Sequence, residues 1–235
     1  MIENSKSQEE RLKSSEPVEK GWTNRVFETP EGTIIKVFSS HFLEALFFGL
    51  FDLSHRKLNI PLRGERLQKE IDVKKDLRRD GFEVPEIIEV YSNAIEMEKV
   101  EGADLREVLQ DGSSEEVREI GYKTGKLFSG LHDAGYSLGD ATFENIYLKG
   151  GNFCTLDHEY ASSDSDFFDK ERDFIHLLSD AMEHKSYSVF REGFEEAYRE
   201  FNRPELVLAA SFSVFTSLLD VNIGQVKETL SNLGN

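Results

Sequence analysis

Three side chains that suit phosphoryl transfer follow one another closely in the sequence. Asp140 is followed by Asn145 five residues later and by Asp157 after twelve more. Phosphoryl transfer uses one carboxylate to orient a hydroxyl and accept its proton, and an amide oxygen and a second carboxylate to hold Mg²⁺ against nucleotide phosphates. We therefore interpret Asp140 as a candidate catalytic carboxylate, and Asn145 and Asp157 as candidate metal ligands.

The segment between the two candidate metal ligands predicts a β-hairpin. Residues 146–148 and 153–156 have the composition of strands, and residues 149–152 contain the Gly-Gly of a tight turn. A hairpin brings its ends together, so we expect Asn145 and Asp157 to share one metal ion. The alternative without chemistry is a helix-capping Asp140 followed by two turn residues.

Residues 131–145, LHDAGYSLGDATFEN, resemble the catalytic loop of the protein-kinase-like superfamily. The similarity is to its small, atypical branches: RIO kinases, the kinase of the KEOPS tRNA-modification complex, lipopolysaccharide kinases and, more distantly, choline and aminoglycoside kinases. Asp157-His158-Glu159 is similar to the D-F-G motif. The resemblance implies an α+β, bilobal protein-kinase-like fold, with an antiparallel-sheet N-lobe and a minimal, mostly helical C-lobe.

Length and composition suit this interpretation. The chain has 235 residues, enough for two small lobes, and a net charge of −17, which argues against direct nucleic-acid binding. The single cysteine, Cys154, favours a reducing cytoplasm. The polar start of the sequence is no secretory signal, and no apolar run approaches the roughly 20 residues of a membrane span. We expect a flexible tail over 1–16, the N-lobe over 17–100 and the C-lobe over 101–235.

Strands are expected between Val18 and Phe38, with Lys36 central in the last of them. In the kinase-like reading Lys36 binds nucleotide phosphates; a solvated lysine is the alternative. The preceding segment resembles the opening of choline and aminoglycoside kinases, but only Gly21 of the usual glycine-rich phosphate loop is present. Thr23 and Asn24 are therefore expected to supply side-chain donors to the phosphates.

A charged helix is predicted over 61–80, with Gly81 as its C-terminal cap. The resemblance implies that Glu70 of this helix pairs with Lys36 and fixes its direction, with Glu65 as the second candidate. The apolar stretch 41–53 precedes the helix and resembles an insertion of lipopolysaccharide kinases. Core packing and a membrane-surface or partner contact are both open for this stretch.

Residues 93–102, NAIEMEKVEG, resemble the strand and hinge that bind adenine in kinases. The carbonyl of Glu98 and the N–H of Val100 are the candidate contacts, and Met97 is the candidate apolar wall of the pocket. An ordinary edge strand and turn is the alternative.

The C-lobe pattern begins with a short helix over 104–109. A longer helix follows, capped by Ser113 or Ser114 and running to about residue 134. We interpret His132, in the kinase pattern L-H-x-x-G, as a packed structural histidine. By the same resemblance, Asp173 is expected to accept hydrogen bonds from backbone amides of the catalytic loop.

Three positions depart from the family pattern. Leu138 replaces the usual histidine before Gly-Asp, His158 replaces the phenylalanine of D-F-G, and Glu159 replaces its glycine. The expected activity is transfer of the γ-phosphate of ATP, with Mg²⁺, to a hydroxyl, foremost a protein Ser or Thr. Two alternatives stay open: a small-molecule or sugar-lipid kinase, and a pseudokinase that only binds nucleotide.

Overall fold

The computed structural model describes residues 8, 11–20, 24–38, 63–182 and 184–200. The chain divides into two compact units, which are residues 1–103 with 146–163, and residues 104–145 with 164–235. Gly21, Thr23 and the apolar stretch 41–53 lie outside the described residues. No helix within the described ranges is long and apolar enough to cross a membrane.

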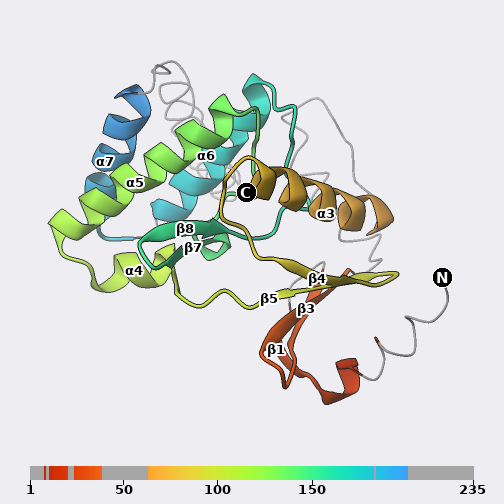
Figure 1. The fold of residues 1–235 in the computed structure, drawn as a ribbon. Helices are drawn as coiled ribbons and strands as arrows, with labels where there is room; N and C mark the ends of the chain where they lie inside the picture. The colour runs from red at the N-terminus through yellow and green to blue at the C-terminus, as the bar shows by residue number, and fades with distance from the viewer. Residues whose placement is uncertain (1–7, 9–10, 21–23, 39–62, 183, 201–235) are drawn as a thin grey trace, which may run out of the picture. The chain divides into compact units, whose positions relative to one another are not determined.

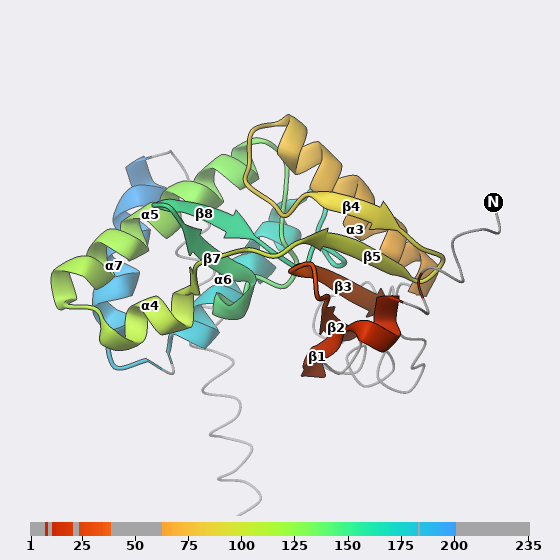
Figure 2. The ribbon, with the colours of Figure 1, turned by 60° about the horizontal axis from the view of Figure 1, so that its bottom comes forward.

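The first unit is built on a five-stranded antiparallel sheet in the order β1-β2-β3-β5-β4 (Figures 1 and 2). Its strands are β1 (Glu16–Lys20), β2 (Asn24–Glu28), β3 (Thr33–Phe38), β4 (Ile87–Val90) and β5 (Ala94–Glu98). β3 occupies the centre, so Lys36 is paired on both sides, with Val26 of β2 and Ile95 of β5. The antiparallel N-lobe sheet expected from the sequence is confirmed.

Helix α3 (Arg63–Arg79) packs on this sheet (Figure 2). Leu67 and Ile71 of the helix join Phe38, Ile95 and Met97 of the strands in one hydrophobic cluster. The helix ends as predicted: Gly81 has a φ of +90°, and the N–H of Phe82 reaches back to the carbonyl of Leu77.

Part of the segment expected to be a flexible tail is ordered against the sheet. Gln8 and residues 11–14 are helical. Nη2 of Arg11 lies 2.7 Å from Oε1 of Glu96, and Nε2 of Gln8 lies 2.8 Å from Oδ1 of Asn93. The tail expectation therefore does not hold at these residues. The physical reason is Glu96, a buried carboxylate on β5 that is stabilised by a cation.

The predicted hairpin is present as β7 (Ile146–Lys149) and β8 (Asn152–Thr155). Gly150 and Gly151 both have positive φ, +59° and +93°, which a two-residue hairpin turn of this kind requires. The hairpin belongs to the first unit, and the N–H of Thr155 donates to the carbonyl of Glu83. The chain passes into the second unit at the short strand β6 (Ala103–Asp104).

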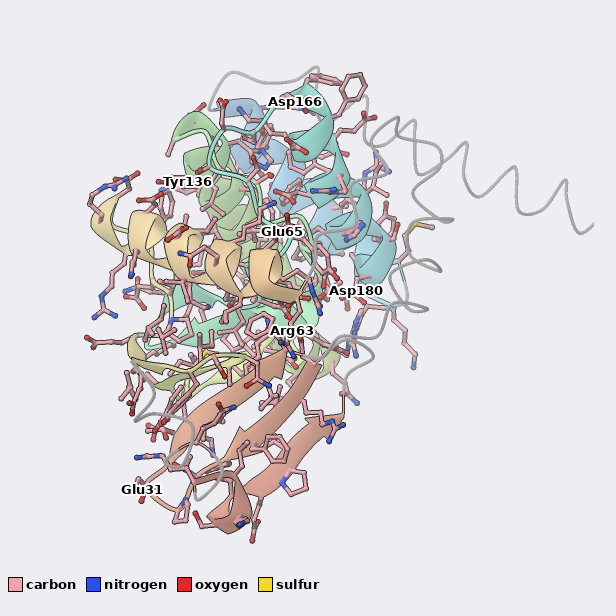
Figure 3. The ribbon with its side chains drawn as sticks, turned by 90° about the vertical axis from the view of Figure 1, so that its right-hand side faces the viewer. Glu31, Arg63, Glu65, Tyr136, Asp166 and Asp180 are labelled. Carbon is pink, nitrogen blue, oxygen red and sulfur yellow. The ribbon has the colours of Figure 1, made fainter. Side chains whose placement is uncertain are left out.

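The second unit is helical, as expected. It contains α4 (Leu105–Asp111), α5 (Ser114–Asp133), η2 (Phe143–Asn145), α6 (Phe167–Ala181) and α7 (Tyr187–Glu200). Ser113 caps α5 in a capping box with Glu116, and Asp166 caps α6 (Figure 3).

Helices α5 and α7 lie side by side (Figures 1 and 2). Glycines allow their backbones to approach closely: a Cβ added at Gly121 would lie 2.1 Å from the carbonyl oxygen of Phe190. Rings from three helices pack edge to face on His132, and they are Phe128, Phe174 and Tyr198. Phe194 packs edge to face on Phe128 and Phe174 and stacks on Tyr198.

Candidate active site

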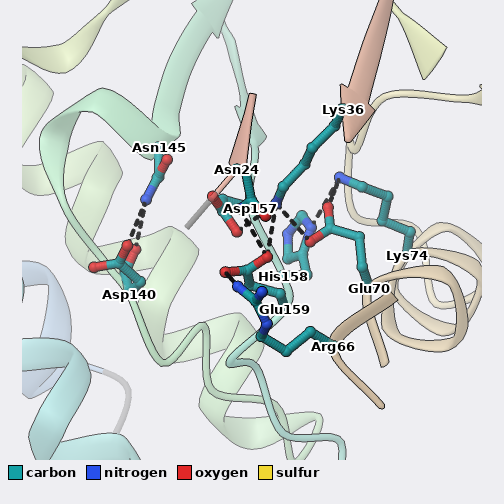
Figure 4. A network of polar contacts seen from close by, with 10 residues as sticks. All are labelled: Asn24, Lys36, Arg66, Glu70, Lys74, Asp140, Asn145, Asp157, His158 and Glu159. Carbon is teal, nitrogen blue, oxygen red and sulfur yellow. Dashed lines mark hydrogen bonds and ion pairs between the residues drawn. The ribbon is translucent and has the colours of Figure 1, made fainter. Parts of the chain in front are cut away.

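The ammonium group of Lys36 lies among three carboxylates of the first unit (Figure 4). Its Nζ is 2.7 Å from Oδ1 of Asp157, 3.2 Å from Oε2 of Glu70 and 3.3 Å from Oε2 of Glu159. Burial alone would lower the pKa of Lys36, but the three negative charges raise it above its ordinary value. Lys36 therefore carries a permanent positive charge. Its ammonium group is held by Glu70 of α3 and by Asp157 and Glu159 of the segment after β8.

The ion pair between Lys36 and Glu70 is the one predicted from the sequence. Glu70 is fully buried on α3, whereas Glu65, the second candidate, is exposed. Burial opposes ionisation of Glu70, but Lys36 and Lys74 lower its pKa well below its usual range. Glu70 is thus an ionised carboxylate between two lysines.

Asp157 has unusual backbone geometry and unusual acidity. Its φ is +52°, the left-handed region that few residues other than glycine adopt. Burial raises the pKa of Asp157 to about 7; Lys36 opposes the rise, and Glu159 and Glu70 add to it. A divalent cation at this carboxylate would favour the ionised form.

His158 stands where the related motif has phenylalanine, and it is fully buried. Nζ of Lys74 lies 3.0 Å from its Nδ1, and Oγ1 of Thr155 lies 3.0 Å from its Nε2. An ammonium group can only donate, so Nδ1 accepts and Nε2 carries the proton. Burial and Lys74 lower the pKa of His158, which keeps the imidazole neutral. The neutral ring of His158 therefore connects Lys74 of α3 with Thr155 at the end of β8 by one hydrogen bond to each.

Glu159 is a buried partner that sequence reasoning did not assign to the site. It pairs with Lys36, with Nη1 of Arg66 at 3.1 Å and with Nδ2 of Asn24 at 2.9 Å. The amide N–H₂ of Asn24 donates one hydrogen bond to the buried carboxylate of Glu159 (Figure 4), and donation by Asn24 to phosphates stays a prediction.

A sequence signal for this network was available on α3. Arg66, Glu70 and Lys74 recur every fourth residue, so they share one face of the helix, and all three are buried. Arg66 and Lys74 join Lys36 as buried cations at the site. Their charges are balanced by the carboxylates of Glu70, Asp157 and Glu159. Buried charges of this kind persist when they are paired.

The same three carboxylates form a set of oxygen donors. One oxygen each from Glu70, Asp157 and Glu159 lies within 4.8 Å of the others. Carboxylate oxygens are suitable ligands for Mg²⁺, so the donor chemistry fits that ion. All three carboxylates contact Lys36, but the side chain of Asp157 is 30% exposed, whereas those of Glu70 and Glu159 are buried. Asp157 is therefore the member of the set best placed to serve a metal.

The candidate hinge residues lie at the end of β5. Met97 is buried in the cluster between the sheet and α3, so it is a core residue here. The N–H of Glu98 donates to the carbonyl of Glu86, and its carboxylate accepts from Nζ of Lys149 at 2.7 Å. Val100 follows in an irregular segment and is partly exposed. Adenine binding by Met97, Glu98 and Val100 stays a prediction.

In the second unit, Asp140 and Asn145 are in direct contact. Nδ2 of Asn145 lies 3.0 Å from the carbonyl oxygen and 3.3 Å from Oδ2 of Asp140 (Figure 4). With its N–H₂ group committed to Asp140, the amide oxygen of Asn145 is the atom left to bind a metal. Asp157 belongs to the first unit, so a metal ion shared by Asn145 and Asp157 also stays a prediction.

Asp173 holds the backbone of the catalytic loop, as expected. Its Oδ2 accepts from the N–H of Leu138 at 2.9 Å, and its Oδ1 accepts from the N–H of Gly139 at 2.7 Å. His132 Nε2 lies 3.1 Å from the same carboxylate, and His132 Nδ1 lies 2.9 Å from the hydroxyl of Tyr198. His132 is completely buried, which confirms its interpretation as a packed structural histidine.

Comparison with known proteins decides the family. The profile of the lipopolysaccharide kinase (Kdo/WaaP) family matches residues 49–198. The chain belongs to this family. The structure pairs Lys36 with Glu70 and Asp140 with Asn145, and the roles of these residues stay predictions.

Curated relatives of this family member include KEOPS complex subunit Bud32 of Pyrococcus abyssi (strain GE5 / Orsay). That protein is 32% identical over 147 residues, which are 62% of this chain and 66% of the relative. A probable serine/threonine-protein kinase BUD32 homolog of Archaeoglobus fulgidus is 26% identical over 149 residues, covering 61% of this chain and 70% of the relative. A probable bifunctional tRNA threonylcarbamoyladenosine biosynthesis protein of Methanosarcina mazei is 27% identical over 150 residues. The match covers 61% of this chain but only 25% of that protein.

Solved structures agree on the fold. The streptomycin–ATP–APH(2")-IIa ternary complex has a TM-score of 0.60 at 12% identity, covering 95% of this chain and 93% of that one. ADP-bound aminoglycoside phosphotransferase APH(2'')-Ib has a TM-score of 0.62 at 11% identity, covering 96% and 90%. The family member therefore has the protein-kinase-like fold.

Proposed function

We propose that this family member is an Mg²⁺-ATP-dependent phosphotransferase that moves the γ-phosphate to a hydroxyl group. The observation that carries the proposal is the buried ammonium group of Lys36, braced by Glu70 and Glu159 and 2.7 Å from Asp157. An aimed, permanently charged lysine beside a carboxylate that suits a metal is the arrangement that nucleotide phosphates require.

Four residues of the chain have separate roles in the proposed phosphoryl transfer. Asp140 orients the acceptor hydroxyl and takes its proton while the hydroxyl oxygen bonds to the γ-phosphorus, and the bond from that phosphorus to the β–γ bridging oxygen breaks to release ADP. Lys36 neutralises charge on the phosphates that remain with ADP. Asn145 and Asp157 would hold Mg²⁺, which when bound screens the charge of the phosphate oxygens. This division is catalysis by positioning and electrostatics.

The acceptor is proposed to be foremost a Ser or Thr of a protein. The support is the similarity to a protein named as a serine/threonine-protein kinase homolog and to a KEOPS complex subunit. The second candidate is a sugar-lipid or other small-molecule hydroxyl, which the lipopolysaccharide kinase family match favours. The proposal includes a cytoplasmic location, which the single cysteine Cys154 favours, and no direct nucleic-acid binding, which the net charge of −17 argues against.

Transfer of labelled γ-phosphate tests this function. The purified chain is incubated with ATP, with and without Mg²⁺, alone for self-phosphorylation and hydrolysis, and with model protein and sugar acceptors. The expected result is Mg²⁺-dependent turnover that Asp140→Asn and Asp157→Asn abolish, while Glu119→Gln on the exposed face of α5 does not. ATP-dependent thermal stabilisation without any turnover would support the pseudokinase instead, and neither binding nor turnover would overturn the proposal.

A further inference from the structure

Helix α6 contacts the catalytic loop through three side chains that recur at helical spacing. Asp173, His176 and Asp180 lie three and four residues apart, so they project from one face of the helix. Asp173 accepts hydrogen bonds from the N–H groups of Leu138 and Gly139. Asp180 accepts one from the N–H of Phe143 at 2.6 Å. The loop is thus held just before and just after Asp140 by one rigid element.

The middle side chain of this series contacts Asp140 itself. Nδ1 of His176 lies 3.3 Å from Oδ1 of Asp140. The other carboxylate oxygen, Oδ2, is 3.3 Å from Nδ2 of Asn145. The two contacts fix different oxygens of one carboxylate, so together they set the rotation of the carboxylate about its last side-chain bond.

The proton positions follow from the chemistry of the two groups. An ionised carboxylate only accepts hydrogen bonds, so Nδ1 of His176 must carry the proton that lies between them. Asp140 and His176 have similar side-chain exposure, 37% and 38%, so both are accessible from solvent.

Neighbouring contacts show that this face of α6 is anchored independently of His176. Nζ of Lys170 donates to the carbonyl of His132 at 2.8 Å, and Nη2 of Arg106 lies 3.2 Å from Oδ1 of Asp180. Asp173 is completely buried. The helix therefore needs no contribution from a partly exposed histidine for its own placement, and the contact of His176 with Asp140 has no evident structural purpose.

We propose that His176 is a positioning residue for phosphoryl transfer: its Nδ1–H holds Oδ1 of Asp140, while Asn145 holds Oδ2, so that the carboxylate faces the acceptor hydroxyl. The assignment rests on the proposed function, since it needs Asp140 to act on an acceptor. His176 touches neither nucleotide nor acceptor in this assignment and acts only through Asp140.

The first experiment compares substitutions that differ in where they place a nitrogen. Mg²⁺-ATP hydrolysis, with water as the acceptor, is measured for wild type, His176→Ala, His176→Asn and His176→Gln. The side-chain nitrogen of asparagine can take the place of Nδ1, whereas that of glutamine lies nearer to Nε2. We expect kcat of His176→Ala to fall about ten- to a hundredfold, as misplacement of a reacting group does. KM for ATP should change less than about twofold, because the nucleotide contacts are untouched.

His176→Asn should recover most of kcat, and His176→Gln should not. Ser179→Ala, an exposed position on the same helix, is the matched control and should equal wild type. Unchanged kcat in His176→Ala, or equal activity of the Asn and Gln variants, would overturn the positioning role while leaving the proposed function standing. A change in KM alone would also overturn it.

A second measurement is independent of turnover. Nitrogen NMR of labelled histidines, at mildly alkaline pH where imidazoles are neutral, reports which ring nitrogen carries the proton. The signal of His176 is identified by its loss in His176→Asn. We expect the Nδ1–H form to dominate and to decline in Asp140→Ala. A dominant Nε2–H form in wild type would overturn the contact. Wild type that shows the contact but no Mg²⁺-ATP turnover would overturn the proposed function, and the positioning role with it.

Discussion

Nζ of Lys36 lies closer to Asp157, at 2.7 Å, than to its predicted partner Glu70, at 3.2 Å. The two residues of the shorter pair are separated by 121 positions and belong to β3 and to the segment after β8. The difference matters because the two carboxylates differ in acidity. Glu70 is strongly stabilised in its ionised form, whereas the pKa of Asp157 is raised to about 7. Glu70 is therefore a permanently ionised partner of Lys36, whereas Asp157 is the partner whose charge changes near neutral pH.

The first prediction concerns cooperation between Lys36 and Glu70. Lys36→Met should lower Mg²⁺-ATP turnover about a hundredfold or more, because the variant lacks the positive charge that neutralises the phosphates. Glu70→Gln should lower it less, about tenfold, since Glu159 still contacts Lys36. The double variant should be little worse than Lys36→Met alone, because the two residues act as one unit. Turnover rates of the two single variants and the double variant test this, and full additivity would show that the pair does not cooperate.

The second prediction is a pH dependence of stability caused by Asp157. Its pKa rises from the ordinary value of 3.8 to about 7, so the folded protein holds this proton to higher pH than the unfolded chain does. The stability that this group contributes is therefore present at acid pH and is lost as pH rises through about 7. Asp157→Asn removes this titration. The Tm of the variant minus that of wild type should therefore increase as pH rises from 3.8 to about 7, and should be constant at higher pH.

These melting curves are recorded with EDTA, so that no divalent cation alters the carboxylate. Asp72→Asn, at an exposed carboxylate of α3 bonded to Gln68, is the control and should show no such trend. A Tm difference for Asp157→Asn that is constant with pH would contradict the raised pKa.

The third prediction separates a buried arginine of α3 from an exposed one. Arg66 lies 3.1 Å from the buried Glu159, whereas Arg78 lies 3.2 Å from Glu86, where both side chains are more than half exposed. Arg66→Ala should reduce the free energy of unfolding by about 3 kcal/mol, because it leaves a buried carboxylate short of a partner. Arg78→Ala should cost at most about 1 kcal/mol. Urea unfolding of the two variants decides, and equal losses would mean that Glu159 is not a buried anion.

The fourth prediction tests the close approach of α5 and α7. A Cβ at Gly121 would lie 2.1 Å from the carbonyl oxygen of Phe190, and backbone cannot rotate away as a side chain can. Gly121→Ala should therefore destabilise the second unit by about 2–3 kcal/mol. Gly64→Ala, in the first turn of α3 with open space around its Cβ position, should be neutral or stabilising by up to about 1 kcal/mol. Thermal melts of both variants check this, and a stable Gly121→Ala would contradict the interhelical contact.

The local sequence pattern determined where several secondary-structure elements begin, turn and end. The hairpin was predictable because Gly-Gly between two short strand patterns favours one turn geometry, and the end of α3 was predictable because Gly81 adopts a φ that other residues avoid. The capping of α5 by Ser113 follows from the same local chemistry. The order of Lys36, Glu70, Asp140, Asn145, Asp157 and Asp173 indicated the kinase-like fold, and the structure pairs Lys36 with Glu70 and Asp173 with the catalytic loop.

Only the tertiary structure decided which polar groups meet across long separations. Asn24 and Glu159 are 135 positions apart, and no local pattern distinguishes an asparagine that serves a phosphate from one that serves a buried carboxylate. The same holds for His176, whose contact with Asp140 depends on the face that α6 turns toward the catalytic loop. Packing sets that face, because burial of Phe174, Leu177 and Leu178 fixes the rotation of the helix and places Asp173, His176 and Asp180 on the loop.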